Sequence, residues 1–278
     1  MRKVGKLFMD PKVSIIISTK NEEKNIETCL KSLQSQSYKN IEIIVIDNFS
    51  SDKTEDIAKK YTPLVYRVGP ERSAQRNFGA TKAKGRFLLF IDADMVVTEN
   101  VIGQCVRFCL SKKGVNAIVI PEKSYGKSFW AKCKGLERSF YEGIEWIEGA
   151  RFFDRKLFLN VGGYNTALIS GEDWDIHARF KKKSKIGRIN SYILHNEGNL
   201  SIAETVKTKY YYAKSIRLYK DITEDSRFKS QSSVVKRYML FFSKPKMLFS
   251  NPFLGIGMLI MKSSEYIAGL IGYFISKK

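Results

Sequence analysis

Apolar runs alternate with polar turns along the first half of the chain. Short apolar runs, typical of strands buried on both faces, occupy residues 13–18, 41–46, 64–68, 87–91 and 116–120. Apolar residues at helical spacing and cap residues predict helices after Asn25, from residues 50–52 through Lys60, and at Ser73–Lys84. This alternation predicts an α/β fold with a mostly parallel sheet, flanking helices and right-handed crossovers.

Polar clusters follow three of the predicted strands. They lie at residues 18–22, 47–52 and 92–94. Each cluster alone is also typical of a loop or a helix cap. Because the carboxyl ends of parallel strands meet at one edge of a sheet, where open α/β sheets bind ligands, the three together predict a binding site.

The cluster Asp92-Ala93-Asp94 directly follows the most hydrophobic run. Two carboxylates one residue apart can approach a single ligand when the chain turns after a strand. Their hard oxygens suit Mg²⁺ or Mn²⁺, and such ions commonly bridge to phosphate oxygens. The spacing therefore predicts a metal and phosphate site.

The charge of the chain favours anionic partners. Its 278 residues carry a formal net charge of +20. Nucleic acid, acidic lipid headgroups and phosphorylated substrates all fit that excess. Residues 179–220 contain eleven Lys or Arg against two Glu, and further basic residues precede an apolar tail. This arrangement favours an anionic membrane over nucleic acid, for which no helix-turn-helix, zinc-finger or RNA-binding motif is present.

The cysteines and the N-terminus agree with a cytosol-facing protein. Cys29, Cys105, Cys109 and Cys133 form no CxxC pair, so neither a zinc site nor a disulfide framework is indicated. The first apolar run is too short for a signal peptide. We expect buried thiols in a reducing location.

Four stretches resemble the nucleotide-sugar-binding core of family 2 inverting glycosyltransferases, which have the GT-A fold. They are VSIIISTKNEEKNIETCLKSL, IEIIVIDNFSSDKT, ERSAQRNFGATKAKGRFLLFIDADM and GEDWDIHARF, in the order of the family. The resemblance covers roughly residues 12–200. It implies a Rossmann-like GT-A catalytic domain at residues 1–205, followed by a basic, amphipathic helical region at 206–278 that associates with a membrane.

The resemblance also implies roles for single residues. The nucleotide sugar would be bound by Thr19, Asn21, Glu22, Asp47, Arg72, Arg76, Asn77 and Asp92. Asp94 would bind the metal beside Asp92. A lone histidine after a strand, such as His195, is usually structural, but some GT-A enzymes use a late histidine as a second protein ligand, which would favour Mn²⁺ over Mg²⁺. Asn48 replaces an acid of the commoner family pattern, so the details of base recognition stay open.

Gly171-Glu172-Asp173-Trp174 contains the second acidic site. Inverting transfer needs a base on the acceptor side, and the family pattern assigns that role to Asp173. Glu172 would contact the acceptor or support the loop. Trp174 is typical of sugar stacking and equally of plain core packing.

The C-terminal third is basic and then apolar. Residues 206–220 form a Tyr-rich helix whose Lys209, Lys214 and Arg217 suit a diphosphate, from the nucleotide or from a lipid-linked acceptor; a solvated basic helix fits equally well. Residues 252–276 are amphipathic, with Lys262 and Glu265 on a narrow face. An interfacial or re-entrant helix is favoured over a membrane span, and both over a helix packed on its own core or on a dimer partner.

Taken together, the sequence predicts a metal-dependent inverting glycosyltransferase at the cytoplasmic face of a membrane, peripheral or monotopic. Its partners would be a nucleotide sugar and a glycan or lipid-linked glycan acceptor, without nucleic acid. The alternative enzyme is a transferase that delivers sugar directly to polyprenyl or dolichyl phosphate. Because a phosphate acceptor needs little base catalysis, the presence of Asp173 favours a hydroxyl acceptor.

Overall fold

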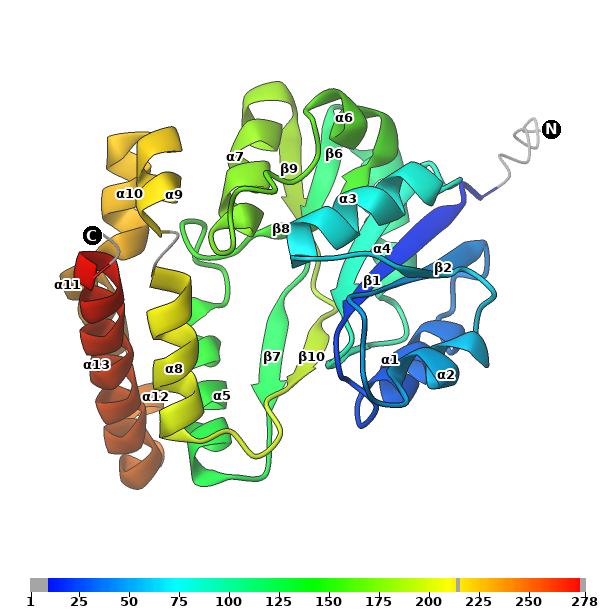
Figure 1. The fold of residues 1–278 in the computed structure, drawn as a ribbon. Helices are drawn as coiled ribbons and strands as arrows, with labels where there is room; N and C mark the ends of the chain where they lie inside the picture. Colours follow the sequence, from blue (N-terminus) through cyan, green and yellow to red (C-terminus); the bar gives the residue numbers. More distant parts are fainter. Residues whose placement is uncertain (1–9, 214–215, 276–278) are drawn as a thin grey trace.

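The computed structural model describes residues 10–213 and 216–275, which fold around two sheets of unequal size (Figure 1). The larger sheet has the strand order β3-β2-β1-β4-β8-β6-β9. Its strands are β1 Val13–Thr19, β2 Ile41–Asp47, β3 Val65–Arg67, β4 Phe87–Asp92, β6 Val115–Val119, β8 Ala150–Asp154 and β9 Lys185–Arg188. All five predicted strands are confirmed.

Most neighbours in this sheet run parallel. β1 pairs with β2 and β4, β2 with β3, and β6 with β9 in parallel, whereas β8 runs antiparallel between β4 and β6. A smaller sheet contains β5 Met95–Val97, β10 Ile193–Asn196 and β7 Glu122–Tyr125 in that order. Through β5 and β10 it places the segment after β4 beside a much later part of the chain.

Helices cover both faces of the larger sheet. They are α1 Ile26–Gln34, α2 Thr54–Lys59, α3 Arg72–Lys82, α4 Val101–Ser111, α6 Arg155–Asn160 and α7 Glu172–Lys183. Side chains of β1 alternate between the faces: Ile15 and Ile17 pack with α1 and α4, and Ile16 packs with α3, α6 and α7. All of β1 is buried, and each such Ile contributes about 1.5–3 kcal/mol to folding.

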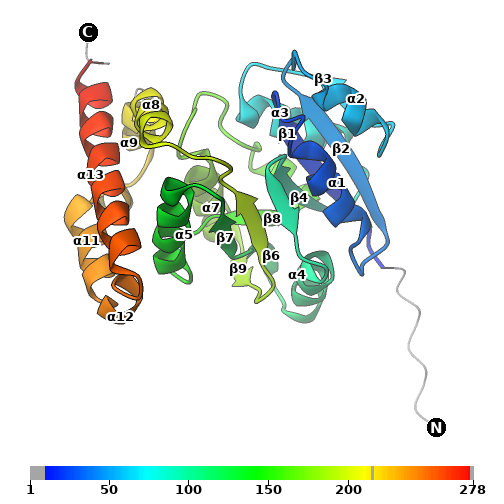
Figure 2. The same ribbon diagram turned by 90° about the horizontal axis from the view of Figure 1, so that it is seen from below.

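The C-terminal helices form a separate layer beside the sheets (Figures 1 and 2). They are α8 Ile202–Ala213, α9 Ile216–Ile222, α10 Asp225–Ser232, α11 Val234–Phe242, α12 Pro245–Leu248 and α13 Pro252–Ile275. α5 Phe129–Tyr141 lies between this layer and the smaller sheet, and α13 packs on α5 and α8. The expected boundary at residue 205 falls inside α8, and the division into two domains stays a prediction.

Helix α13 packs with its polar side inward. Lys262 and Glu265 are buried, whereas the apolar side chains on the other side are exposed. Those exposed are Phe253, Ile256, Ile260, Ile267, Leu270, Ile271, Phe274 and Ile275. The predicted narrow charged face is therefore confirmed, and it contacts the protein itself. α13 is also long and apolar enough to cross a membrane by length and composition, although 39% of its most apolar stretch is buried against the protein.

Candidate active site

Hydrogen bonds connect the polar loops that follow β1 and β2. Asn21 and Phe49 adopt left-handed backbone conformations, with φ of 53° and 50°. The Asn21 side chain accepts a hydrogen bond from the Ser51 backbone N–H at 2.8 Å, and the Ser50 hydroxyl accepts one from the Asn21 N–H. Asn tolerates this backbone conformation better than most residues, which explains its place here.

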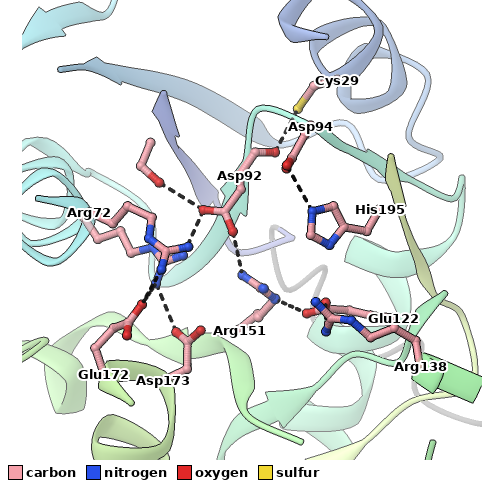
Figure 3. A network of polar contacts seen from close by, with 12 residues as sticks. Cys29, Arg72, Asp92, Asp94, Glu122, Arg138, Arg151, Glu172, Asp173 and His195 are labelled. Atoms are coloured by element: carbon pink, nitrogen blue, oxygen red, sulfur yellow. Dashed lines mark hydrogen bonds and ion pairs between the residues drawn. The ribbon is translucent and has the colours of Figure 1, made fainter. Parts of the chain in front are cut away.

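Arg76 from α3 connects the first and second acidic sites (Figure 3). Its Nη2 contacts Asp92 Oδ1 at 2.8 Å, and its Nη1 contacts Asp173 Oδ1 at 3.0 Å. Nη1 also lies 3.6 Å from Glu172 Oε1. The Arg76 side chain is 1% exposed, so the predicted acidic groups meet around one buried cation.

Asp92 at the end of β4 is held by two arginines. Oδ1 accepts hydrogen bonds from Arg76 and from the Ser18 hydroxyl, and Oδ2 lies 3.6 Å from Arg151 Nη1. Burial opposes ionisation of Asp92, but the charges of Arg76, Arg151 and Arg72 outweigh it and lower its pKa. Both oxygens are thus engaged with cations of the chain, and Asp92 as a metal ligand stays a prediction.

Asp94 and His195 form a pair that fits a divalent cation. His195 lies on β10, which is antiparallel to β5 next to the Asp92-Ala93-Asp94 turn, and its Nε2 lies 3.0 Å from Asp94 Oδ2. Asp94 Oδ1 is buried and has no hydrogen-bond partner among the described residues. Nowhere in residues 10–213 and 216–275 do three His, Cys, Asp or Glu gather as a complete metal site. A cation here would therefore take its other ligands from substrate phosphate and water.

The second acidic site begins at a left-handed glycine. Gly171 has φ of 82° and directly precedes α7, so Glu172 and Asp173 occupy its first turn. Glu172 is buried, and burial together with the nearby Asp173 charge raises its pKa. Arg72 Nη2 lies 3.4 Å from Glu172 Oε1. Asp173 is the more accessible of the two carboxylates, with its side chain 33% exposed.

Three charged residues of the site were missed in the sequence. Arg151 from β8 contacts Glu122 from β7 through Nε at 2.5 Å, and Arg138 Nη1 from α5 lies 3.4 Å from Glu122. The Arg151 guanidinium lies between Asp92, Asp173, Glu122 and His195 in Figure 3. Arg151 and Arg138 lower the pKa of Glu122 to about 2 against the effect of its burial. The ion pairs Glu122–Arg151 and Arg151–Asp92 thus link the two sheets.

A cavity of about 890 Å³ unites these groups. Asp92, Glu172, Asp173 and His195 line it, as does Arg151. Asp94 is connected to it through His195. The cavity continues between α5, α8, α11 and α13, so the C-terminal layer contributes walls to the same space.

The predicted nucleotide residues divide into two sets. Arg72 and Asp92 line the cavity, whereas Thr19, Asn21, Glu22 and Asp47 lie at the neighbouring strand ends. The buried carboxylate of Asp47 accepts hydrogen bonds from the Ser50 N–H and hydroxyl. The Glu22 carboxylate accepts one from Asn25, and burial is the main cause that raises its pKa.

Asn77 serves the adjacent loop. Its amide donates to the Tyr164 carbonyl and accepts from the Tyr164 N–H, both at 2.8 Å. Both ends of the amide are thereby engaged with backbone. A nucleotide-binding role for Asn77 stays a prediction.

The two predicted acceptor residues both line the cavity. Trp174 donates through its indole N–H to the Ile147 carbonyl at 2.7 Å and packs beside Tyr219. Lys209 projects from α8. Lys214 and the Arg217 side chain lie outside the described residues.

Unsatisfied polar atoms gather in two places. Among the described residues, eight buried side-chain atoms lack a hydrogen-bond partner. Six belong to the site around the strand ends: Thr19 Oγ1, Arg76 Nε, Asp94 Oδ1, Arg151 Nη1, Tyr164 Oη and His195 Nδ1. The other two are Arg237 Nε and Tyr266 Oη in the C-terminal layer. Because buried polar groups are normally satisfied, these atoms have room for a partner such as water, an ion or a ligand.

The sequence matches a known family. The model of glycosyl transferase family 2 matches residues 14–167, more than half of the chain. A GalNAc(5)-diNAcBac-PP-undecaprenol beta-1,3-glucosyltransferase of Campylobacter jejuni is 26% identical over 231 residues, which span 78% of this chain and 67% of that protein. The putative glycosyltransferase EpsH of Bacillus subtilis is 35% identical over 103 residues, or 35% of this chain and 30% of EpsH.

Solved structures share the fold. A mannosyltransferase of Pyrobaculum calidifontis in complex with GDP-Man and Mn²⁺ aligns with a TM-score of 0.67 at 15% identity, covering 98% of this chain and 89% of that one. TarS 1–349 of S. aureus in complex with UDP-GlcNAc aligns with a TM-score of 0.54 at 17% identity, covering 94% and 90%. The predicted GT-A fold is therefore confirmed.

Proposed function

The chain belongs to glycosyl transferase family 2, and on that premise we propose that it transfers a sugar with inversion from a nucleotide sugar to a hydroxyl of a lipid-linked glycan at a membrane surface. One observation carries the proposal. Asp92, the Asp94–His195 pair and Asp173 adjoin one cavity, so donor, cation and base share a common space.

The donor side is formed by the strand ends. Thr19, Asn21, Glu22 and Asp47 lie where a nucleotide would meet the sheet edge, and Arg72 adds positive charge toward the diphosphate. A divalent cation held by Asp94 and His195, either Mn²⁺ or Mg²⁺, would neutralise charge on the departing nucleoside diphosphate. The mannosyltransferase neighbour, which contains GDP-Man and Mn²⁺, supports this choice.

Asp173 would take the acceptor proton. Arg76 holds Oδ1, and Oδ2 accepts no hydrogen bond from the described residues. The acceptor hydroxyl oxygen forms the new bond to the anomeric carbon as the bond to the diphosphate oxygen breaks on the opposite face. The hydroxyl proton moves to Asp173.

Two observations support a lipid-linked acceptor and a membrane location. The relative from Campylobacter jejuni is named for a glycan linked to undecaprenol through a diphosphate. The exposed apolar side of α13 offers a surface to lipid. The proposed location is the cytoplasmic face, peripheral or monotopic.

Substitution of the base tests the reaction type. Asp173→Asn should leave donor binding within a few fold and reduce transfer about 10²- to 10⁴-fold, because only proton transfer is lost. Calorimetric donor titration and radiolabelled transfer to an alkyl-linked oligosaccharide measure both. Unchanged transfer would reject Asp173 as base. Transfer to a polyprenyl phosphate without transfer to the oligosaccharide would favour the alternative acceptor.

A second substitution tests the cation site. Asp94→Ala should abolish the Mn²⁺-dependent thermal stabilisation by the donor in a panel of nucleotide sugars and reduce turnover. Asp56→Ala, at an exposed acid on α2, is the control and should behave like the native chain. Near-native metal-dependent activity of Asp94→Ala would exclude it as a ligand.

A further inference from the structure

The cavity extends away from the catalytic carboxylates into the C-terminal layer. There it is lined by charged and phenolic side chains from four helices, which we call the helical arm of the cavity: Lys134, Glu137, Tyr141, Lys209, Arg237, Lys262, Glu265 and Tyr266. Apart from Lys134, Glu137 and Tyr141, these residues lie beyond the segment matched by the family model. The family pattern therefore assigns the C-terminal side chains no role.

Two carboxylates of the helical arm are fully engaged. Lys134 Nζ lies 2.8 Å from Glu137 and 2.9 Å from Glu265, and Lys262 Nζ lies 2.5 Å from Glu137 and 2.6 Å from Glu265. Two lysines thus balance two glutamates. The other cations of the arm, Lys209 and Arg237, form no ion pair with a carboxylate among the described residues, although the charge of Glu265 still acts on Lys209. Four cations against two glutamates leave the arm with an excess of positive charge.

Arg237 from α11 is buried with an unsatisfied atom. It is 7% exposed, its Nη2 donates to the Gln231 carbonyl at 3.0 Å, and its Nε has no partner among the described residues. The rings of Tyr141 and Trp146 lie 4.9 and 5.1 Å from its guanidinium carbon. Aromatic faces compensate only part of the cost of burying a cation, so the position favours an anion.

Lys209 from α8 adds to the excess positive charge of the arm. Glu265 favours its charged form, but burial and the neighbouring Lys134 and Lys262 outweigh this and lower the pKa of Lys209 to about 8. Tyr266 from α13 adds a buried hydroxyl without a partner among the described residues. An anion in the arm would therefore meet two cations and one free hydroxyl.

We propose that the helical arm binds the diphosphate group of a lipid-linked acceptor through Lys209, Arg237 and the Tyr266 hydroxyl. The inference rests on the proposed function and adds a binding site for the diphosphate group of the acceptor. A diphosphate diester carries two negative charges, which match the excess of cations over carboxylates in the arm. Leu270 of α13 lines the cavity and is 56% exposed, so the lipid chain can leave the arm along the apolar outer face.

A binding experiment tests the site without turnover. Farnesyl diphosphate is titrated calorimetrically into the full chain and into Lys209→Gln, Arg237→Gln and Tyr266→Phe. The dissociation constant should rise about 10-fold or more for the first two and about 3- to 10-fold for the third, as charge-assisted hydrogen bonds are lost. Lys207→Gln, at an exposed lysine of the same helix, is the matched control and should bind like the native chain.

Several results would overturn the assignment. Native affinity of Lys209→Gln and Tyr266→Phe would remove both residues from the site, even if Arg237→Gln failed to fold. Equal weakening in Lys207→Gln would indicate nonspecific charge attraction. Loss of farnesyl diphosphate binding in Asp94→Ala would place the diphosphate in the donor site, and displacement by phosphatidylglycerol vesicles would point to a lipid headgroup instead.

Turnover separates this inference from the proposed function. The KM for a polyprenyl-diphosphate-linked oligosaccharide should rise about 10-fold in Lys209→Gln, with an unchanged KM for the same oligosaccharide as an alkyl glycoside. If transfer occurs and the KM changes equally for both acceptors, the proposed diphosphate site is rejected and the proposed glycosyltransferase activity is retained. Absence of transfer, with Lys209-dependent binding of farnesyl diphosphate, rejects the proposed acceptor reaction and keeps the anion site.

Discussion

Arg76 holds together carboxylates that lie far apart in the sequence. Its guanidinium contacts Asp92 on β4 and Asp173 on α7, and its side chain is almost completely buried. Removal of one partner from a buried ion pair leaves an uncompensated charge, which costs more than the pair itself contributes. Arg76 is therefore a structural requirement of the site.

Arg76→Gln should lower the free energy of unfolding by about 3–5 kcal/mol, because Asp92 and Asp173 lose their shared cation. Urea unfolding followed by circular dichroism measures the change. Arg67→Gln removes a largely exposed arginine that pairs with Glu55, and should cost less than about 1 kcal/mol. Similar losses in both variants would contradict the role of burial.

His177 makes the free energy of unfolding decrease at acidic pH. Its Nδ1 accepts a hydrogen bond from the Ala150 N–H, which requires the neutral ring. Burial, Arg227 and Lys181 lower the pKa of His177 to about 4, against the opposing effect of Glu145 and Glu148. The unfolded chain, with a pKa near 6.5, binds the proton first, so this contribution is complete above pH 6.5 and is lost as the pH falls toward 4.

His177→Gln should weaken the pH dependence of the free energy of unfolding at acidic pH. The native chain should lose on the order of 1–3 kcal/mol of unfolding free energy from this group between pH 7 and pH 4, and the variant should lose less. Denaturant titrations at several pH values measure both curves. Parallel curves would show that His177 does not titrate on unfolding.

Part of the site was predictable from local motifs. The position of Asp92 and Asp94 after a buried strand predicted a metal and phosphate site, whereas Asp173, in the first turn of a helix, was predicted from the resemblance to the family. Arg151 stands within a short strand, and its partners Asp92 and Glu122 are distant in sequence. Only the pairing of β8 with β4 brings them together, which no local pattern reports.

At the scale of elements, α13 is attached by charges. Lys262 and Glu265 meet Lys134 and Glu137 of α5 across the interface. Gly257 permits the close approach, because a Cβ there would lie 2.6 Å from the Phe129 ring and 2.7 Å from Cys133 Sγ. The helix and its charged face were predictable from spacing, whereas partners some 130 residues earlier in the chain were not.

Lys262→Met should loosen α13, because Glu137 and Glu265 would repel one another beside the remaining Lys134. We expect a loss of about 3–5 kcal/mol and faster proteolysis within α13. Ser264→Ala changes a hydroxyl that bonds only to the Ile260 carbonyl of its own helix among the described residues, and should stay within about 0.5 kcal/mol. Equal protease resistance in all three chains would argue against the charged attachment.

Several short strands escaped prediction. β5 and β7 have three and four residues, too few to display a period, and Arg151 interrupts the apolar run of β8; the equally short β3 was predicted from its apolar residues. The long parallel strands β1, β2 and β4 were visible because both their faces are buried. The fold class was therefore predictable, and the antiparallel β8 insertion was not.

At the scale of the whole molecule, α11 and α13 contact each other through Tyr238 and Tyr266 and both expose apolar side chains. Those of α11 include Val235 and Met239, and the exposed Lys236 and Lys246 lie near them in the sequence. Apolar burial together with attraction to anionic lipid is the usual basis of interfacial binding. The net charge of +20 predicted an anionic partner. The sequence of α13 alone did not show that its charged residues, Lys262 and Glu265, are buried against the protein.

Ile260→Ser combined with Ile267→Ser should abolish flotation with phosphatidylglycerol vesicles and leave the unfolding midpoint near its native value, since both side chains are at least half exposed. Leu110→Ser, at an equally exposed leucine of α4, is the control and should still float. Flotation of the double variant would exclude this face as the lipid contact.

The inverted polarity of α13 reverses the usual rules of mutational tolerance. In an ordinary amphipathic helix the apolar positions are buried and sensitive to substitution, whereas the charged positions are exposed and tolerate most residues. Here saturation mutagenesis should find the opposite: swaps among Ile, Leu and Phe pass unnoticed, while every replacement of Gly257, Lys262 or Glu265 is damaging. A hydropathy profile alone would assign such a segment as a membrane anchor. The residues that tolerate least change in α13 are instead those that pack against the protein.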